Sequence, residues 1–191
     1  VLASCGDAEE EVAPGTEATA SPTATTAGST TPAGATPVSV PSGWSTYTDR
    51  TAGFSIPQPP GLTVSEEQYQ LPERKGLPTP RGRTLWFRTA DGVPAIVLAV
   101  ADNPANLTIE EWVSTYTGWS GVPEDFAIGG ERAVLDPMDQ VNNPVPQIYF
   151  RHGTYLLTLQ LNVNGIPESG FPAALSESDF SHIVEGFRFE E

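Results

Sequence analysis

The segment that most constrains the fold is residues 95–100, because all six positions are apolar. Side chains of a strand point alternately to the two faces of a sheet, so a strand that is apolar throughout needs cover on both faces. We therefore predict a central strand here. Residues 84–89 are its predicted neighbour, since the Asp91-Gly92 pair between them favours a tight reversal. Such a sheet requires helices on both faces, or a helix on one face and loops on the other.

Other stretches alternate between apolar and polar residues, or are rich in β-branched and aromatic residues, as is typical of strands. The predicted hairpins and shorter strands are 45–48 with 53–56, 126–128 with 132–135, 147–151 with 154–163, then 62–64 and 187–189. The strand at 154–163 has one apolar face and one half-polar face. Residues 68–82, which contain three prolines, are predicted to form an exposed loop.

Two helices are predicted from their capping residues and their apolar spacing. The first has a capping box of Thr108 and Glu111, ends at Gly118, and carries an apolar stripe at Ile109, Trp112, Val113 and Tyr116. The second starts near residues 175–179, has Gly186 as its C-cap, and carries an apolar stripe at Phe180, Ile183, Val184 and Phe187. The sequence therefore predicts an α+β fold.

The N-terminal residues resemble the end of a bacterial lipoprotein signal, with Leu2, Ala3 and Ser4 before Cys5 and Gly6. The resemblance implies that residues 1–5 end the signal and that Cys5 is lipidated, which would anchor the protein at the extracytoplasmic face of the cell membrane. The alternative is a buried or incidental cysteine, but the flanking residues have no apolar pattern that would bury it. Cys5 is the only cysteine, so an exported domain must rely on its core rather than on an intrachain disulfide.

Residues 6–42 consist mainly of Thr, Ala, Pro, Ser and Gly, with almost no large apolar side chains. Such a segment cannot offset its ordering entropy, so we predict a disordered tether. It would span on the order of 35 Å as a flexible coil and about 110 Å in extended polyproline form. Its Thr and Ser residues beside Pro also resemble mucin-like stalks, which leaves O-glycosylation open. Residues 43–191 are predicted to form a single globular domain.

The net charge of −15, from 24 acidic and 9 basic residues, keeps the chain soluble and repels polyanions. Nucleic acid is therefore not a predicted partner. No apolar run reaches the roughly 18 residues that would span a bilayer, so the expected membrane link is the lipid on Cys5.

Four segments together resemble the PsbP-like family in their order and spacing, namely 44–56, 108–112, 128–133 and 180–189. The resemblance covers nearly all of residues 44–189 and implies an antiparallel β-sheet sandwiched by helices, an α/β/α arrangement. One departure is Pro59-Pro60-Gly61-Leu62, where many bacterial members have Pro, a small residue and Trp. Members are mostly extrinsic membrane-associated subunits or surface lipoproteins that bind other molecules, and the family lacks a shared catalytic centre.

The sequence offers few candidates for chemistry. His152, in a predicted hairpin turn, and His182, on the polar face of the second helix, are the only histidines, and both are interpreted as surface residues. Catalytic, nucleotide-binding and zinc motifs are missing, so we predict neither a catalytic residue nor a cofactor. Residues 136–143 offer oxygen ligands that leave Ca²⁺ binding open, but they lack the Gly and the terminal Glu of an EF-hand loop.

Trp119, just after the first helix, is interpreted either as an exposed anchor for a partner or as a buried lid. The predicted function is a non-enzymatic binding or accessory domain, lipid-anchored outside the cell, that recognises an unknown protein or small molecule. Two alternatives remain open. One is an envelope enzyme with a site assembled from loop residues, and the other is a carrier of a small apolar ligand between the sheet and a helix.

Overall fold

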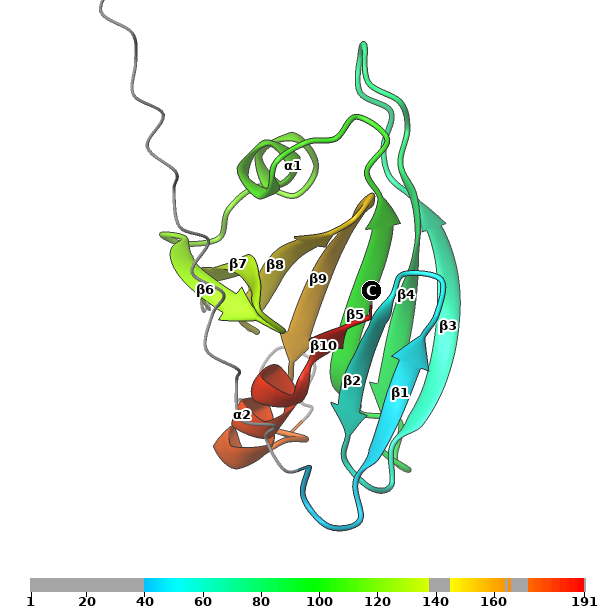
Figure 1. Cartoon of the computed structure of the whole chain (residues 1–191), viewed down its shortest axis with the longest axis vertical. Helices are drawn as coiled ribbons and strands as arrows, with labels where there is room; N and C mark the ends of the chain where they lie inside the picture. Colours follow the sequence, from blue (N-terminus) through cyan, green and yellow to red (C-terminus); the bar gives the residue numbers. More distant parts are fainter. Residues whose placement is uncertain (1–39, 138–144, 164, 166–171, 191) are drawn as a thin grey trace, which may run out of the picture. The chain divides into compact units, whose positions relative to one another are not determined.

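A seven-stranded antiparallel sheet organises the part of the chain that the computed structural model describes, which is residues 40–137, 145–163, 165 and 172–190 (Figure 1). Its strands, in spatial order, are β3 (Thr63–Gln70), β4 (Arg81–Arg88), β5 (Pro94–Asp102), β9 (Tyr155–Leu161), β8 (Gln147–His152), β7 (Glu131–Asp136) and β6 (Glu124–Ile128). β5 is internal to the sheet and mostly buried, which confirms the predicted central strand. Cys5, most of the predicted tether and most of the possible Ca²⁺ ligands at 136–143 lie outside the described residues.

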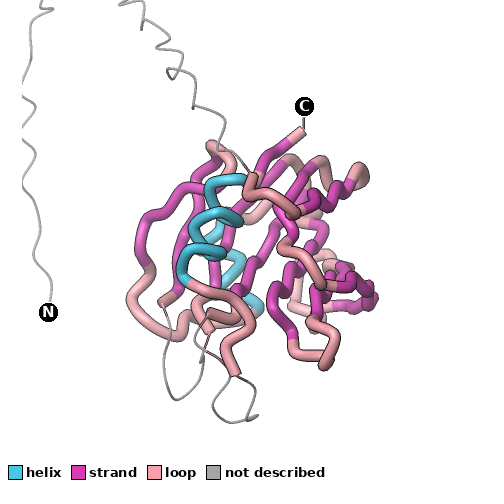
Figure 2. Tube along the Cα trace, turned by 90° about the horizontal axis from the view of Figure 1, so that it is seen from below, coloured by secondary structure: helices cyan, strands magenta, loops and turns pink. Residues whose placement is uncertain are grey.

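A second, three-stranded sheet has β2 (Phe54–Gln58) between β1 (Ser45–Asp49) and β10 (Arg188–Phe189). β10 pairs antiparallel with the start of β2, so the end of the chain joins the first hairpin. The predicted first hairpin and final short strand are confirmed. Strands make up most of the regular structure, as the magenta segments of Figure 2 show.

The two helices are α1 (Ile109–Tyr116) and α2 (Glu177–Gly186), and both begin with a complete capping box. In α1 the Thr108 hydroxyl accepts the N–H of Glu111, whose carboxylate in turn accepts the N–H of Thr108, as predicted. In α2 the N-cap is Ser176. Among the described residues, neither helix is long and apolar enough to cross a membrane.

The prediction of Gly186 as the C-cap of α2 is wrong by one residue. Gly186 is the last helical residue, and Phe187 is the cap. The glycine is explained by close packing, because a Cβ atom at Gly186 would lie 2.4 Å from Cγ of Pro57 in β2. A side chain at this position would push α2 away from the three-stranded sheet.

The predicted loop at 68–82 is also too long, because β3 continues to Gln70 and β4 already begins at Arg81. β3 pairs with β4 along its full length, from Thr63 opposite Arg88 to Gln70 opposite Arg81. It is an edge strand, and nearly all of its residues are exposed. Since neither of its faces is apolar, the sequence lacks the alternation that reveals a half-buried strand.

The seven-stranded sheet contacts two separate hydrophobic cores. Phe150 and Leu157 belong to the larger core, whereas their chain neighbours Tyr149 and Leu156 belong to the smaller one. Neighbouring residues of a strand point to opposite faces, so the two cores lie on opposite faces of the sheet. The larger core includes residues of α2 and of the three-stranded sheet, and the smaller core includes residues of α1. We call these two surfaces the α2 face and the α1 face.

An ion pair between a buried carboxylate and a half-buried guanidinium links the two sheets. Asp49, at the end of β1, is 6% exposed, and its Oδ2 atom lies 2.6 Å from the guanidinium of Arg83 in β4. The Oδ1 atom of Asp49 accepts the N–H groups of Thr51 and Ala52, which fixes the turn between β1 and β2. One carboxylate therefore sets both the turn and the attachment of the small sheet to the large one.

Candidate functional site

A groove of about 280 Å³ lies on the α1 face, beside α1. We call it the α1 groove. Its lining residues come from β3 and the residue after it, from β4, β5, β8 and β9, and from α1 and its C-cap. They are Tyr69, Leu71, Thr84, Ala99, Ala101, Trp112, Thr117, Gln147, Leu156, Thr158 and Gln160.

The floor of the groove consists of cross-strand rows. Ala101 is opposite Leu156 in the first row, and Ala99 is opposite Thr158 in the second. Gln160 is opposite Gln147 in the third. Residues directly opposite each other in paired strands share a face of the sheet. The register therefore assembles the floor from β5 and the β8–β9 hairpin, which are far apart in the chain.

Tyr69 in β3 forms one wall of the groove. It lies opposite Gly82 of β4, where a Cβ atom would be only 2.6 Å from Cζ of Tyr69. Gly82 thus allows the Tyr69 ring to lie across β4. Burial, together with the nearby charge of Asp102, raises the pKa of Tyr69 to about 12. The phenol therefore stays neutral over the physiological pH range and can donate a hydrogen bond.

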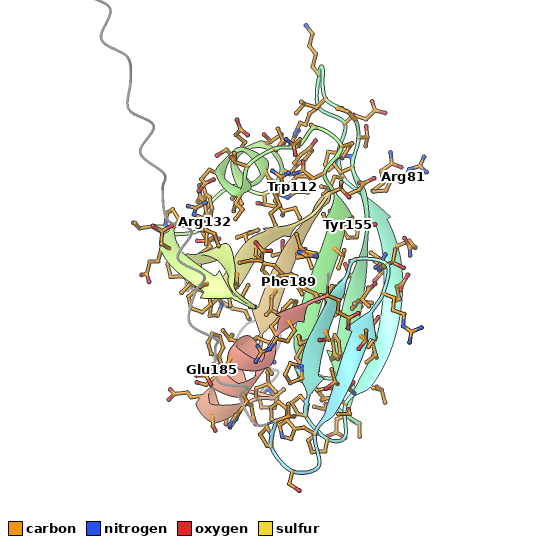
Figure 3. All side chains as sticks on the ribbon, in the orientation of Figure 1. Arg81, Trp112, Arg132, Tyr155, Glu185 and Phe189 are labelled. Atoms are coloured by element: carbon orange, nitrogen blue, oxygen red, sulfur yellow. The ribbon has the colours of Figure 1, made fainter. Side chains whose placement is uncertain are left out.

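Trp112 forms the roof. It is 3% exposed, lies between α1 and the sheet, and has its ring 4.7 Å from that of Tyr116 (Figure 3). The predicted core role of Trp112 is confirmed. The capping box at Thr108 fixes the first turn of α1 and thereby the position of this ring one turn further on.

A hydrogen-bonded wall stands at the Gln147 end of the groove. Tyr149 is 1% exposed, and its hydroxyl donates to Oε1 of Gln147 at 2.7 Å. The ring of Trp119 meets that of Tyr149 edge-on at 5.7 Å, and Trp119 is half-buried. The fully buried carboxylate of Asp136 accepts the N–H groups of Ser120 and Gly121, which holds the segment after Trp119.

The lining of the groove is uncharged. Its polar members are threonines, glutamines and a neutral tyrosine, and its remaining members are apolar. A buried charge requires a partner, so this lining favours an uncharged ligand. Pockets for small molecules are typically concave and mostly apolar, with a few polar groups that fix orientation. The α1 groove has this composition, at the small end of the usual size range.

A second, wider cleft of about 450 Å³ includes His152, Arg50 and Glu190 in its lining. His152 is the last residue of β8 rather than part of the turn, and its side chain is 23% exposed. Its ring stacks on that of Phe189 at 4.4 Å, and its Nδ1 atom lies 3.6 Å from the Glu131 carboxylate. The prediction of a turn residue is therefore wrong, because β8 is one residue longer than its apolar pattern indicates.

His182 lies on α2 and is half-buried. Its ring meets that of Trp44 edge-on at 5.8 Å, and its Nδ1 atom lies 3.5 Å from the Ser178 hydroxyl. Within the described residues, His, Cys, Asp and Glu form no group of three or more that could hold a metal. Most of the loop for which Ca²⁺ binding was left open falls outside those residues, at 138–144.

The chain matches no protein-family model, no curated protein and no solved structure. What the fold defines is a sheet-rich α+β domain of two antiparallel sheets and two helices, with a groove beside α1. The sequence alone does not predict any polar residue of the groove floor as a site residue. The available signal was the half-polar face predicted for the strand at 154–163, which carries Thr158 and Gln160.

Proposed function

We propose that the globular domain is a non-enzymatic binding module and that the α1 groove holds a small, uncharged ligand. The observation that carries this proposal is the lining itself, in which neutral hydrogen-bonding groups converge beside apolar ones under a buried tryptophan. The groove lies between the sheet and a helix, as the carrier hypothesis requires. A carrier and a receptor would differ in whether the ligand is passed on, and both begin with this binding step.

The proposal includes the location. A lipid on Cys5 would hold the domain at the extracytoplasmic face of the cell membrane, with residues 6–42 as a flexible tether. A Cys5→Ser change in the full precursor should move the protein from the membrane fraction to the soluble fraction of its native cell. Retention of that variant in the membrane fraction would contradict the anchor while leaving the groove untouched.

We also propose that the domain is a PsbP-like α/β/α sandwich. The support is that residues of α1 and α2 belong to cores on opposite faces of the seven-stranded sheet. Members of the PsbP-like family are expected to bind rather than transform their partners, but fold alone does not assign a function. The groove chemistry therefore carries the proposal, and the resemblance is consistent with it.

The test of binding uses the full chain and a small-molecule extract of the native cell envelope. Mass spectrometry identifies what the protein retains. Ala99→Trp places a large ring on the groove floor and should abolish retention, whereas Ala127→Trp makes the same change on exposed β6 and should not. Equal retention by the two variants would rule out the groove as the site.

One observation favours the envelope-enzyme alternative, namely the proximity of His152 to the Glu131 carboxylate beside an open cleft. A histidine oriented by a carboxylate is a common general base. If this alternative holds, a His152→Gln variant should lose turnover of an envelope substrate while its retention of the groove ligand is unchanged. Retention lost in Ala99→Trp, with no activity that depends on His152, would favour the binding module.

A further inference from the structure

We infer that the α1 groove takes an uncharged amphipathic molecule, whose apolar end lies beneath Trp112 and whose polar end presents a hydrogen-bond acceptor to the side-chain amide of Gln147. This inference rests on the proposed function and adds to it the class of ligand and its orientation. Three features of the groove carry it, namely a change of polarity along the floor, the fixed orientation of one amide, and the uncharged lining.

The polarity of the floor changes along β9. Leu156 and its partner Ala101 form the row near Trp112, and all three belong to the smaller core. Gln160 and its partner Gln147 form the row at the other end. The two rows are four residue positions apart along β9, which corresponds to about 13 Å at the usual rise per residue. A ligand that fills the groove thus meets aliphatic and aromatic groups at one end and carboxamides at the other.

The amide of Gln147 is oriented by Tyr149. Oε1 of Gln147 accepts the Tyr149 hydroxyl at 2.7 Å, and a carboxamide has only one oxygen and one NH₂ group. Burial raises the pKa of Tyr149, so the phenol keeps its proton at pH 7 and donates it to Oε1 of Gln147. The Tyr149 hydroxyl engages the oxygen of Gln147 and not its NH₂ group, so a ligand in the groove should offer that NH₂ group an acceptor such as a carbonyl or ether oxygen.

The absence of charge among the described lining residues excludes the two common charged head groups. Asp136 accepts two backbone N–H groups and Asp102 accepts the N–H of Arg81, so these two carboxylates are already engaged. Glu67 of edge strand β3, opposite Thr84, is exposed to solvent and is not part of the lining. An ammonium group at the polar end would lack an ionic partner, and so would a carboxylate. Because a buried charge without a partner is costly, the lining selects a neutral acceptor.

The test compares three probes with matched chains, 2-octanone, octanoate and octylammonium, added to the full chain at pH 7. NMR follows the side-chain NH₂ of Gln147 and the indole N–H of Trp112, so that both ends of the groove are observed. We expect 2-octanone to shift both signals and to bind at least about tenfold more tightly than either charged probe. Equal binding of all three probes would overturn the inference.

Gln147→Glu tests the orientation, because it keeps an acceptor for Tyr149 and replaces the NH₂ group with a carboxylate oxygen. It should weaken 2-octanone binding about tenfold and strengthen octylammonium binding. Gln70→Glu is the matched control on exposed β3, whose side chain is not part of the lining, and it should change neither affinity. Unchanged 2-octanone affinity in Gln147→Glu would overturn the inference.

A second variant guards against misfolding of the first. Gln160→Glu adds a charge to the same row but leaves the hydrogen bond between Tyr149 and Gln147 intact, so octylammonium binding should rise while the Gln147 signal still responds to 2-octanone. If no probe shifts a groove signal, the inferred ligand class is wrong. If the native protein and Ala127→Trp still retain an envelope ligand that Ala99→Trp does not, the proposed function holds even though the inferred ligand class is wrong. The two failures can therefore be distinguished.

Discussion

The two faces of the seven-stranded sheet are built from the same strands but differ in how completely they are filled. On the α2 face, the side chains that alternate along β4, β5, β8 and β9 are almost entirely inaccessible to solvent, including Leu85, Phe87, Leu98, Phe150, Leu157 and Leu159. On the α1 face, the intervening side chains at the groove are smaller or polar, and several are only half-buried, including Thr84, Ala99, Thr158 and Gln160. The α2 face is therefore the more completely packed, whereas the α1 face carries the smaller core and an open groove.

The lengths of the covering elements explain this difference. α1 has eight residues and is about 12 Å long, whereas seven strands extend over about 29 Å. Such a helix cannot cover the face on which it lies. The opposite face is packed by α2 and by the three-stranded sheet together, through Phe54, Ile56, Ile183 and Phe187. The groove is thus a consequence of a short helix on a wide sheet.

The largest contrast is expected between Phe150→Ala and Thr158→Ala. The Phe150 ring is fully buried and lies 5.2 Å from that of Phe187, so its removal leaves a cavity and should cost about 3–5 kcal/mol of unfolding free energy. Thr158 faces the groove, and its truncation should change the unfolding free energy by no more than about 0.5 kcal/mol. Urea denaturation measures both. Similar losses would mean that the two faces contribute equally to stability.

The next effect concerns the attachment of the three-stranded sheet. Asp49→Ala removes the closer of the two carboxylates that pair with Arg83, the other being Glu66 at 3.9 Å, and the acceptor of two N–H groups, and it should cost about 3 kcal/mol. The control is Glu110→Gln, which weakens an exposed pair with Arg132 and should cost no more than about 0.5 kcal/mol. Chemical denaturation of both variants tests this, and a small loss in Asp49→Ala would show that apolar packing alone holds the sheets together.

The elements that the sequence predicts correctly are those with a strong local signal. β5 is apolar from Pro94 to Ala101, and α1 carries its capping box and its stripe within a few residues, so each can be recognised without knowing its neighbours. β3 could not be recognised, because a polar edge strand is specified by its pairing with β4 and by little in its own sequence. Gly186 was misinterpreted for a related reason, since its role depends on Pro57, more than a hundred residues away in the chain.

The groove could not be predicted because its floor exists only after the strands have paired. Gln147 and Gln160 become neighbours through the register of β8 and β9, and Thr84 joins them only through β5. Each of these residues on its own is an ordinary polar position in a half-exposed strand. The orientation of Gln147 depends further on a hydrogen bond that no spacing pattern encodes.

A smaller effect is expected from the cap of α1. Thr108→Ala removes the acceptor of the Glu111 N–H and should cost about 1 kcal/mol, and Ser176→Ala should cost a similar amount at α2. Only the first change loosens the roof of the groove. Hydrogen exchange of the Trp112 indole should therefore become faster in Thr108→Ala and stay unchanged in Ser176→Ala. Equal exchange rates in the two variants would show that α1 does not depend on its cap to position Trp112.

The last difference between the faces appears only at high pH. The pKa of Tyr69 on the α1 face is raised from 10.0 to about 12, so the folded state keeps this proton after the unfolded chain has begun to lose it. Stability from Tyr69 is therefore fully present below pH 10 and declines as the pH rises from 10 to about 12. The unfolding free energy of the native protein, minus that of Tyr69→Phe, should be constant up to pH 10 and then fall. The pKa of Tyr47, on the α2 face, is also raised, mainly by burial, so Tyr47→Phe provides the comparison. If the unfolding free energy of the native protein minus that of Tyr69→Phe stays constant through pH 12, the Tyr69 phenol is hydrated. The wall of the groove that it forms is then hydrated as well.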